Sequence, residues 1–198
     1  MQKNRGLKGW LARPAPCVLG LQRRWLTRAG ALTQGLRQLG PLALRVLSEN
    51  VCRANRDEAA RLGLRPGDAV WQREVCMSIL GIDCVMARSV APLAATRGHW
   101  QALRRLRNRP LADILYRDRA IVRSDFEFKI LQLGMPLYRL CQTSSTAGLT
   151  VMARRSVFTR AGQPLLVAEA FLPAFWAIAK EANTSARSCR AARHARAS

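Results

Sequence analysis

Two stretches of the chain have the hydrophobic pattern of β-strands, and each carries a single charge among apolar positions. In residues 71–80, the two-residue alternation places Arg73 on the apolar side. In residues 164–172 both sides are apolar and Glu169 is the only ionisable residue, a pattern typical of a buried strand. Removing an unpaired charge from water costs on the order of several kcal/mol. Arg73 and Glu169 must therefore be paired, protonated, or directed into a wet cavity of ligand size.

The same kind of pattern predicts four further strands and two hairpins. Residues 80–83 form a plausible hairpin connection after the first stretch, and the Gly-containing loop 159–163 separates the last two strands. Six strands connected partly by hairpins predict a mainly antiparallel sheet. The four further strands are expected at residues 42–52, 85–90, 122–131 and 149–158.

Helical periodicity occurs between the predicted strands. Residues 25–39 have apolar positions at helical intervals, and Gly40-Pro41 supplies the end of this amphipathic helix. Residues 100–107 and 111–116 also have helical patterns, and Pro110 stands at the tolerated first turn of the second one. The predicted fold class is therefore α+β, a single domain whose six-stranded, mainly antiparallel sheet is flanked by helices.

The basic residues are concentrated at the two ends of the chain. The formal net charge is +21, yet residues 1–40 contain no acidic residue, and residues 177–198 are small, polar and basic. We therefore expect a basic N-terminal extension at residues 1–21, the folded domain at 22–176, and a basic, disordered tail at 177–198. A nucleic-acid-binding protein would use these ends, but aromatic residues do not interleave with the basic runs as stacking platforms. We expect no specific nucleic-acid partner.

Composition also argues against a metal site and a membrane span. The chain has six cysteines without a CxxC motif and two histidines, which predicts no metal and no structural zinc. No convincing secretory signal is visible, and free thiols suit a reducing cytoplasm. The longest apolar stretch, residues 164–179, is interrupted by Glu169 and Pro173 and is too short to cross a bilayer.

Five short motifs, in order and at suitable spacings, resemble those of the chorismate pyruvate-lyase family. The resemblance covers about residues 22–176, and the most specific part is the final strand with Glu169 followed by Phe-Leu-Pro. The motifs are WQREV at 71–75, ARSVAP at 87–92, RPLAD at 109–113, ARRSVF at 153–158 and GQPLLVAEAFLP at 162–173.

The resemblance implies that the chain converts chorismate to 4-hydroxybenzoate and pyruvate, the first committed step towards ubiquinone, without metal or organic cofactor. It implies that Arg73 contacts the substrate and that Glu169 contacts the product, both as catalytic residues. Leu111 matches a backbone-contact position of the family, and Leu32 matches a position in its N-terminal helix. We expect a cytoplasmic monomer whose partners are this substrate and this product.

The residue types suit that ligand. Chorismate carries two carboxylates and a ring hydroxyl, and a guanidinium such as that of Arg73 offers a bidentate fork to a carboxylate. Glu169 can accept a hydrogen bond from the hydroxyl if ionised, or donate one if burial keeps it protonated. Arg154 and Arg155 are neighbours in a strand and must point to opposite faces. At most one of them joins the site, and we take Arg155 as the candidate.

Two other interpretations stay open at this point. Arg73 and Glu169 could form a buried structural salt bridge between two strands. The domain could also be a non-catalytic, effector-sensing module that binds a small aromatic acid, as in some bacterial regulators. No DNA-binding helix-turn-helix pattern precedes the domain in this sequence, which favours the enzyme.

Overall fold

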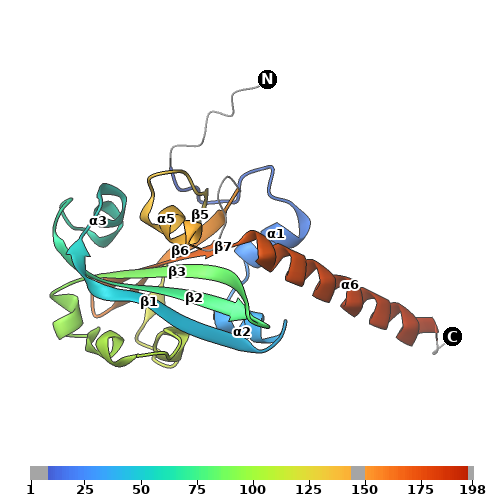
Figure 1. Cartoon of the computed structure of the whole chain (residues 1–198). Helices are drawn as coiled ribbons and strands as arrows, with labels where there is room; N and C mark the ends of the chain where they lie inside the picture. The colour runs from blue at the N-terminus through green and yellow to red at the C-terminus, as the bar shows by residue number, and fades with distance from the viewer. Residues whose placement is uncertain (1–8, 144–149, 196–198) are drawn as a thin grey trace, which may run out of the picture.

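The computed structural model describes residues 9–143 and 150–195, and an antiparallel sheet forms its centre (Figure 1). The strand order is β1-β2-β3-β7-β6-β4, and β5 also pairs with β6. The strands are β1 (Leu42–Arg53), β2 (Ala69–Ile79), β3 (Ile82–Pro92), β4 (Val122–Arg123), β5 (Glu127–Ile130), β6 (Met152–Arg160) and β7 (Gln163–Phe171). The predicted α+β, mainly antiparallel fold is confirmed.

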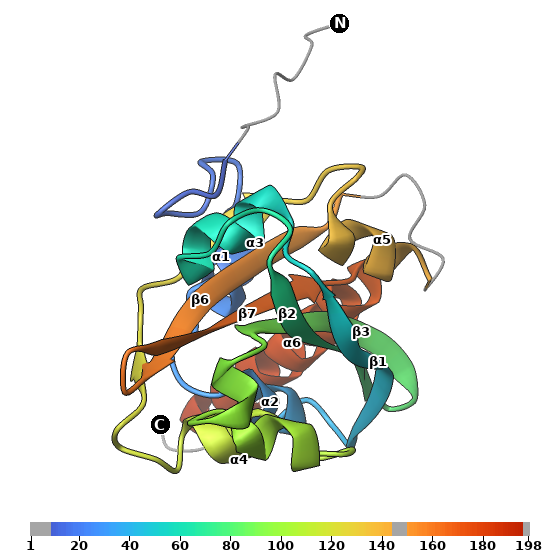
Figure 2. The ribbon, with the colours of Figure 1, turned by 90° about the vertical axis from the view of Figure 1, so that its left-hand side faces the viewer.

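Helices cover both faces of the sheet. Figure 2 shows α2 and α4 on one side of the sheet, and α3 and α5 on the other. Arg73 and Glu169 lie on the side of α2 and α4, here called the pocket face, and Arg88 lies on the opposite side, the rear face. The helices are α1 (Gly20–Leu26), α2 (Leu32–Arg37), α3 (Arg56–Leu62), α4 (Ala112–Leu115), α5 (Pro136–Gln142) and α6 (Pro173–Ala195), with 3-10 turns at Ala95–Arg97 and Gln101–Arg105.

Two tight turns set the register of the strands that carry the site. Leu80 and Gly81 connect β2 to β3 with φ angles of 54° and 81°. Ala161 and Gly162 connect β6 to β7 with φ angles of 46° and 76°. Two consecutive residues with positive φ are the signature of a type I′ hairpin turn, which matches the twist of the flanking strands. Both predicted hairpins are confirmed, although the second loop is shorter than the expected 159–163.

The sheet has seven strands in the described residues, where six were expected. The predicted strand at 122–131 is two short strands, because the chain bulges between Arg123 and Glu127. At the bulge the Ser124 hydroxyl accepts a hydrogen bond from the Val157 amide at 3.0 Å and replaces a backbone carbonyl in the ladder. A side-chain bond of this kind leaves no periodic signal in the hydrophobic pattern.

The N-terminal helical region also differs from the prediction. The single helix expected at 25–39 is α1 and α2, separated by the linker 27–31, in which Gly30 has a φ of 76°. The expected helix at 100–107 is a 3-10 turn, and α5 was not predicted. The break after α1 matters for the site, because α2 turns over the pocket face.

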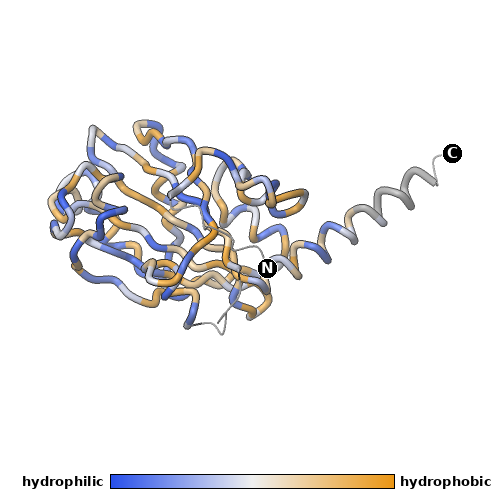
Figure 3. The backbone as a smooth tube through the Cα atoms, turned by 90° about the horizontal axis from the view of Figure 1, so that it is seen from above, coloured by the Kyte–Doolittle hydropathy of each residue, from blue (hydrophilic) through white to orange (hydrophobic). Residues whose placement is uncertain are grey.

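Both ends of the chain have more structure than expected. Leu11 pairs with Phe128 of β5, and Ala15 and Val18 are buried, so residues within the expected extension 1–21 pack on the sheet. The expected disordered tail begins inside α6, which the structure describes as helical to Ala195 and which leaves the body of the molecule (Figure 3). None of the described helices has the length and apolar character to cross a membrane.

Candidate functional site

A cavity of about 60 Å³ lies between the pocket face and its covering helices. On this scale a single water needs about 10–15 Å³, so the cavity has room for several water-sized groups. Four predicted residues, distant in sequence, line it together. They are Leu32 from α2, Arg73 from β2, Leu111 from the loop before α4, and Glu169 from β7.

The floor of the cavity follows from the strand register. Arg73 of β2 lies opposite Ser89 of β3, and two residues away on β3, Ala87 lies opposite Glu169 of β7. Residues two apart on a strand share a face. Arg73 and Glu169 therefore point to the same side of the sheet with β3 between them, as the alternation predicts.

Arg73 is almost fully buried at 2% exposure. One Nη atom donates to the backbone carbonyls of Arg107 and Arg109 at 2.7 and 3.1 Å. Its Nε lies 3.6 Å from a carboxylate oxygen of Glu49 and has no hydrogen-bond partner among the described residues. Burial lowers the pKa of Arg73 from its ordinary value, and the Glu49 charge opposes that shift. A buried guanidinium that lines a cavity and has an unsatisfied N–H is suited to an anionic ligand.

Glu49 shares the environment of Arg73. Burial raises the pKa of the Glu49 carboxyl, and the charges of Arg73 and Arg104 oppose this. The 3.6 Å contact is a loose ion pair rather than a hydrogen bond. Glu49 therefore offsets part of the charge of Arg73 and leaves its donors available.

Glu169 is held by a different arginine. The Nε of Arg154 donates to Glu169 Oε2 at 2.7 Å, a charge-assisted bond between directly paired residues of β6 and β7. Arg154 also donates through Nη1 to the backbone carbonyls of Trp25, Leu26 and Arg28 at 3.4, 3.3 and 2.8 Å. The structure therefore has no Arg73–Glu169 salt bridge, and each of the two charges has its own partner.

Two covering segments close the cavity above the floor. One is the start of α2, with Leu32 and Thr33, and the other is the loop Pro110–Leu111 with α4. The Tyr116 hydroxyl donates to the Gly30 carbonyl at 2.9 Å and joins the two segments. The cavity is thus covered by a segment that precedes β1 and by part of the connection between β3 and β4.

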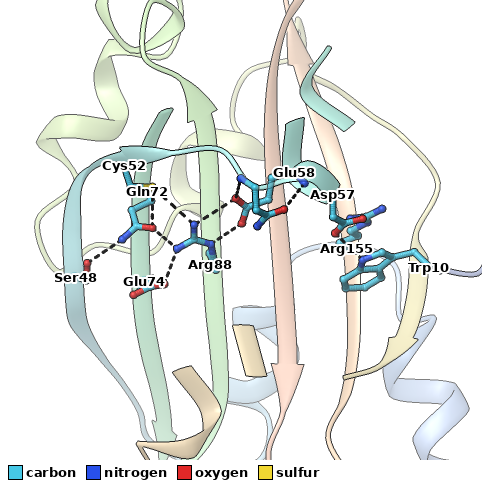
Figure 4. A network of polar contacts seen from close by, with 10 residues as sticks. Trp10, Ser48, Cys52, Asp57, Glu58, Gln72, Glu74, Arg88 and Arg155 are labelled. Atoms are coloured by element: carbon cyan, nitrogen blue, oxygen red, sulfur yellow. Dashed lines mark hydrogen bonds and ion pairs between the residues drawn. The ribbon is translucent and has the colours of Figure 1, made fainter. Parts of the chain in front are cut away.

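Arg155, the candidate chosen from the sequence, points away from this cavity. On the rear face it donates to Asp57 at 2.7 Å, and its guanidinium lies 4.3 Å from the ring centre of Trp10 (Figure 4). It also donates to Glu127 at 2.8 Å. Of the neighbours Arg154 and Arg155, it is Arg154 that lines the cavity, together with Arg73. If the turn between the last two strands is taken as residues 161–162, the register places Arg154 opposite Glu169. With that turn the sequence predicts Arg154, not Arg155, on the pocket face.

Aromatic residues also line the cavity, at positions that depend on tertiary contacts. Phe126 lies just before β5 and places its ring 4.3 Å from the Arg154 guanidinium. Tyr116 and Phe158 also line the cavity and contact each other edge to face. Their hydrophobic pattern alone is that of ordinary core residues.

Two other cavities in the described part of the chain differ from this one. The smaller, of about 30 Å³ on the rear face, is lined by Arg88 and Arg155 together with their own carboxylate partners. A larger cavity of about 140 Å³ lies between the N-terminal segment and β5–β6, but no arginine or carboxylate lines it. No group of three or more potential metal-binding side chains occurs in the part of the chain that the structure describes. Burial raises the pKa of the Cys76 and Cys141 thiols to about 12, which is the behaviour of core residues.

Comparison with solved structures identifies the fold. The effector domain of PhnF from Mycobacterium smegmatis superposes with a TM-score of 0.51 at 16% identity, covering 81% of this chain and 92% of that one. The C-terminal domain of the histidine utilization repressor from Pseudomonas syringae pv. tomato gives a TM-score of 0.51 at 15% identity, covering 67% and 92%. At such low identity these similarities concern the fold alone.

Comparison of sequences is more specific. A probable chorismate pyruvate-lyase from Bordetella avium is 54% identical over 168 residues, which cover 85% of each chain. Probable chorismate pyruvate-lyase 1 from Pseudomonas fluorescens is 39% identical, covering 85% of this chain and 91% of the relative. The family model described as chorismate lyase matches residues 13–181, which include every strand of the sheet and the whole cavity floor. The chain belongs to the chorismate lyase family.

Proposed function

We propose that this protein is a chorismate pyruvate-lyase, a carbon–oxygen lyase that converts chorismate to 4-hydroxybenzoate and pyruvate. One observation carries the proposal. The four residues that the family resemblance assigns to the ligand, Leu32, Arg73, Leu111 and Glu169, line one cavity although they come from four separate segments. The high identity to chorismate pyruvate-lyases over most of the chain supports it.

Arg73 binds a carboxylate of the substrate in this proposal. Its Nη2 already holds two backbone carbonyls, whereas Nε is buried without a hydrogen-bond partner among the described residues. A carboxylate in the cavity pairs with the guanidinium through the donors that the protein does not use. Because the cavity wall is otherwise largely apolar, this bond is formed in a low-dielectric environment that strengthens it.

Glu169 binds the ring hydroxyl on the other side of the floor. The strand β3 separates Arg73 and Glu169, so an aromatic acid lying across β3 places its carboxylate and its hydroxyl at opposite ends. This arrangement matches the para substitution of 4-hydroxybenzoate. It also orients the substrate ring before the reaction.

The reaction requires orientation more than a strong nucleophile. The ring C–O bond breaks with its electron pair leaving on the enolpyruvyl oxygen, the ring carbon bearing the hydroxyl loses its proton, and the methylene carbon gains a proton to give pyruvate. The proton reaches that carbon directly within the substrate or with the help of a group in the pocket. Aromatisation drives the reaction, so the cavity contributes mainly by fixing the geometry and excluding water.

Several further expectations belong to the same proposal. The cavity is built by one chain, which suits a monomer. We propose that the enzyme acts in the cytoplasm, needs no metal or cofactor, has no specific nucleic-acid partner and supplies 4-hydroxybenzoate for ubiquinone synthesis. Turnover that persists after treatment with a chelator tests whether the enzyme needs a metal. The molar mass from light scattering tests whether it is a monomer.

The decisive experiment mixes the purified protein with chorismate and follows both products. Absorbance reports 4-hydroxybenzoate, and a coupled assay reports pyruvate. Equal appearance of the two products is the expected result. Binding of chorismate or 4-hydroxybenzoate without turnover would instead identify an effector-sensing domain, the alternative that the fold similarity to regulator domains keeps in view.

A further inference from the structure

Arg154 stands at the junction of three parts of the site. It is 1% exposed, and its side chain contacts the Glu169 carboxylate, the carbonyls that follow the last turn of α1, and the ring of Phe126. Burying a guanidinium is favourable only when its donors are satisfied. These contacts are an ion pair, hydrogen bonds to carbonyls and a cation–π contact, and together they stabilise the buried charge of Arg154.

The contacts with α1 explain how the linker 27–31 is held. The last carbonyls of a helix have no partner within the helix and carry its partial negative charge. Arg154 donates to the Trp25 and Leu26 carbonyls and, most closely, to that of Arg28. The same linker leads to Leu32 and the covering segment. A single guanidinium thus connects the cover to the floor.

The contact with Glu169 determines what this carboxylate can offer a ligand. Arg154 Nε occupies Oε2 at 2.7 Å, which leaves Oε1 for a group in the cavity. A carboxylate paired with a guanidinium acts as an acceptor. The aromatic ring of Phe126, packed on the guanidinium, restricts the movement of Arg154 and so of the pair.

We propose that Arg154 is the positioning residue of this site: it fixes Glu169 as a hydrogen-bond acceptor for the hydroxyl of the aromatic acid and ties that carboxylate to the linker 27–31. The inference rests on the proposed ligand class. It resolves the choice that the sequence left open, because Glu169 then accepts a hydrogen bond from the hydroxyl rather than donating one. Arg154 acts through Glu169 and not on the ligand directly.

A pair of ligands that differ only in the hydroxyl tests the proposal. Calorimetric titration measures the affinities of 4-hydroxybenzoate and benzoate for the wild-type protein and for Arg154→Gln. We expect the wild type to prefer 4-hydroxybenzoate by about 10-fold or more, the size of a hydrogen bond to a charged group. Arg154→Gln should lose most of that preference while its affinity for benzoate changes by less than about threefold, because Arg73 still holds the carboxylate.

Two controls separate positioning from general loss of structure. Arg155→Gln removes a buried arginine from the next position of β6 but on the rear face, and it should keep the wild-type preference. In a Glu169→Gln background, replacing Arg154 should change the preference by less than about twofold, because two residues acting as a unit are not additive. If Arg154→Gln does not fold, Arg154→Lys carries the same test, since one ammonium cannot span Glu169 and the α1 carbonyls together.

The outcomes are distinct from those that test the proposed function. Equal weakening of both ligands in the Arg154 variant, an unchanged preference, or a wild type that does not discriminate between the ligands would each overturn the inference. These are binding measurements, so they stand even if chorismate is bound without turnover. Turnover by the wild type together with an unchanged preference in Arg154→Gln would refute the role of Arg154 alone.

Discussion

The two faces of the sheet each bury two arginines, but they treat the charges differently. On the rear face, Arg88 contacts Glu58 and Glu74, and Arg155 contacts Asp57 (Figure 4). Arg155 also contacts Glu127. Each of these arginines has two carboxylate partners. On the pocket face, Arg73 has Glu49 and Arg154 has Glu169, one carboxylate each.

The remaining donors on the pocket face are directed at backbone carbonyls or have no partner. Arg73 and Arg154 hold the carbonyls of the segments that cover the cavity. The rear-face arginine Arg88 instead has a pKa raised above its ordinary value, since its bonds to Glu58 and Glu74 outweigh the effect of burial. On the rear face the carboxylates outnumber the two buried arginines, which suits a role in stability and disfavours an anionic ligand. The pocket face has one carboxylate for each arginine and an Arg73 donor without a partner among the described residues, which suits an anionic ligand.

The largest expected effect follows from removing charge on the pocket face. Arg73→Ala should lower kcat/KM for chorismate by about 1000-fold, because truncating one partner of a buried charge pair costs about 2–5 kcal/mol. Initial rates of 4-hydroxybenzoate formation measure it. Arg65→Ala, which removes an exposed arginine next to a turn, is the control and should keep the wild-type rate. Equal rates for the two variants would show that Arg73 does not bind the substrate.

The matching change on the rear face should affect stability instead. Arg88→Ala leaves Glu58 and Glu74 buried without their cation, which costs about 3 kcal/mol and lowers Tm by about 10 °C. Thermal unfolding measures this, and kcat/KM of the folded protein should stay within about threefold of wild type. The variant Arg88→Met, Glu58→Gln, Glu74→Leu removes the charges together and should regain most of the lost stability.

A loss of turnover in Arg88→Ala as large as that in Arg73→Ala, without a change in Tm, would contradict this division between the faces. A triple variant less stable than Arg88→Ala would contradict it too. In that case the network of Figure 4 would support the reaction rather than the fold.

The sequence predicted the strands of the floor because their pattern is local. Alternation alone placed Arg73 on the pocket face, and the turn residues Leu80-Gly81 and Ala161-Gly162 sufficed for the hairpins. The choice between Arg154 and Arg155 needed the register across one hairpin, and a one-residue shift reverses the two faces. The loop predicted at 159–163 is longer than the observed two-residue turn and does not fix that register.

Features that depend on contacts between distant segments could not be predicted. The break between α1 and α2 is held by Arg154, more than 100 residues away in sequence. The packing of Leu11 against β5 and the split between β4 and β5 likewise depend on partners that the hydrophobic pattern does not identify. The resemblance to a known family supplied Leu32 and Leu111, which no physical pattern in the sequence singles out.

The smallest expected effect concerns how the pocket face is closed. Tyr116 donates to the Gly30 carbonyl and joins the two covering segments. Tyr116→Phe removes one hydrogen bond, which contributes about 1 kcal/mol, so the product should dissociate about fivefold faster. Stopped-flow displacement of 4-hydroxybenzoate measures the rate. Tyr138→Phe, on the helix α5 in the rear-face core, is the matched control and should leave the rate unchanged. If both variants release the product at the wild-type rate, the Tyr116 bond does not hold the covers, and closure of the cavity depends on the carbonyl contacts of Arg73 and Arg154 instead.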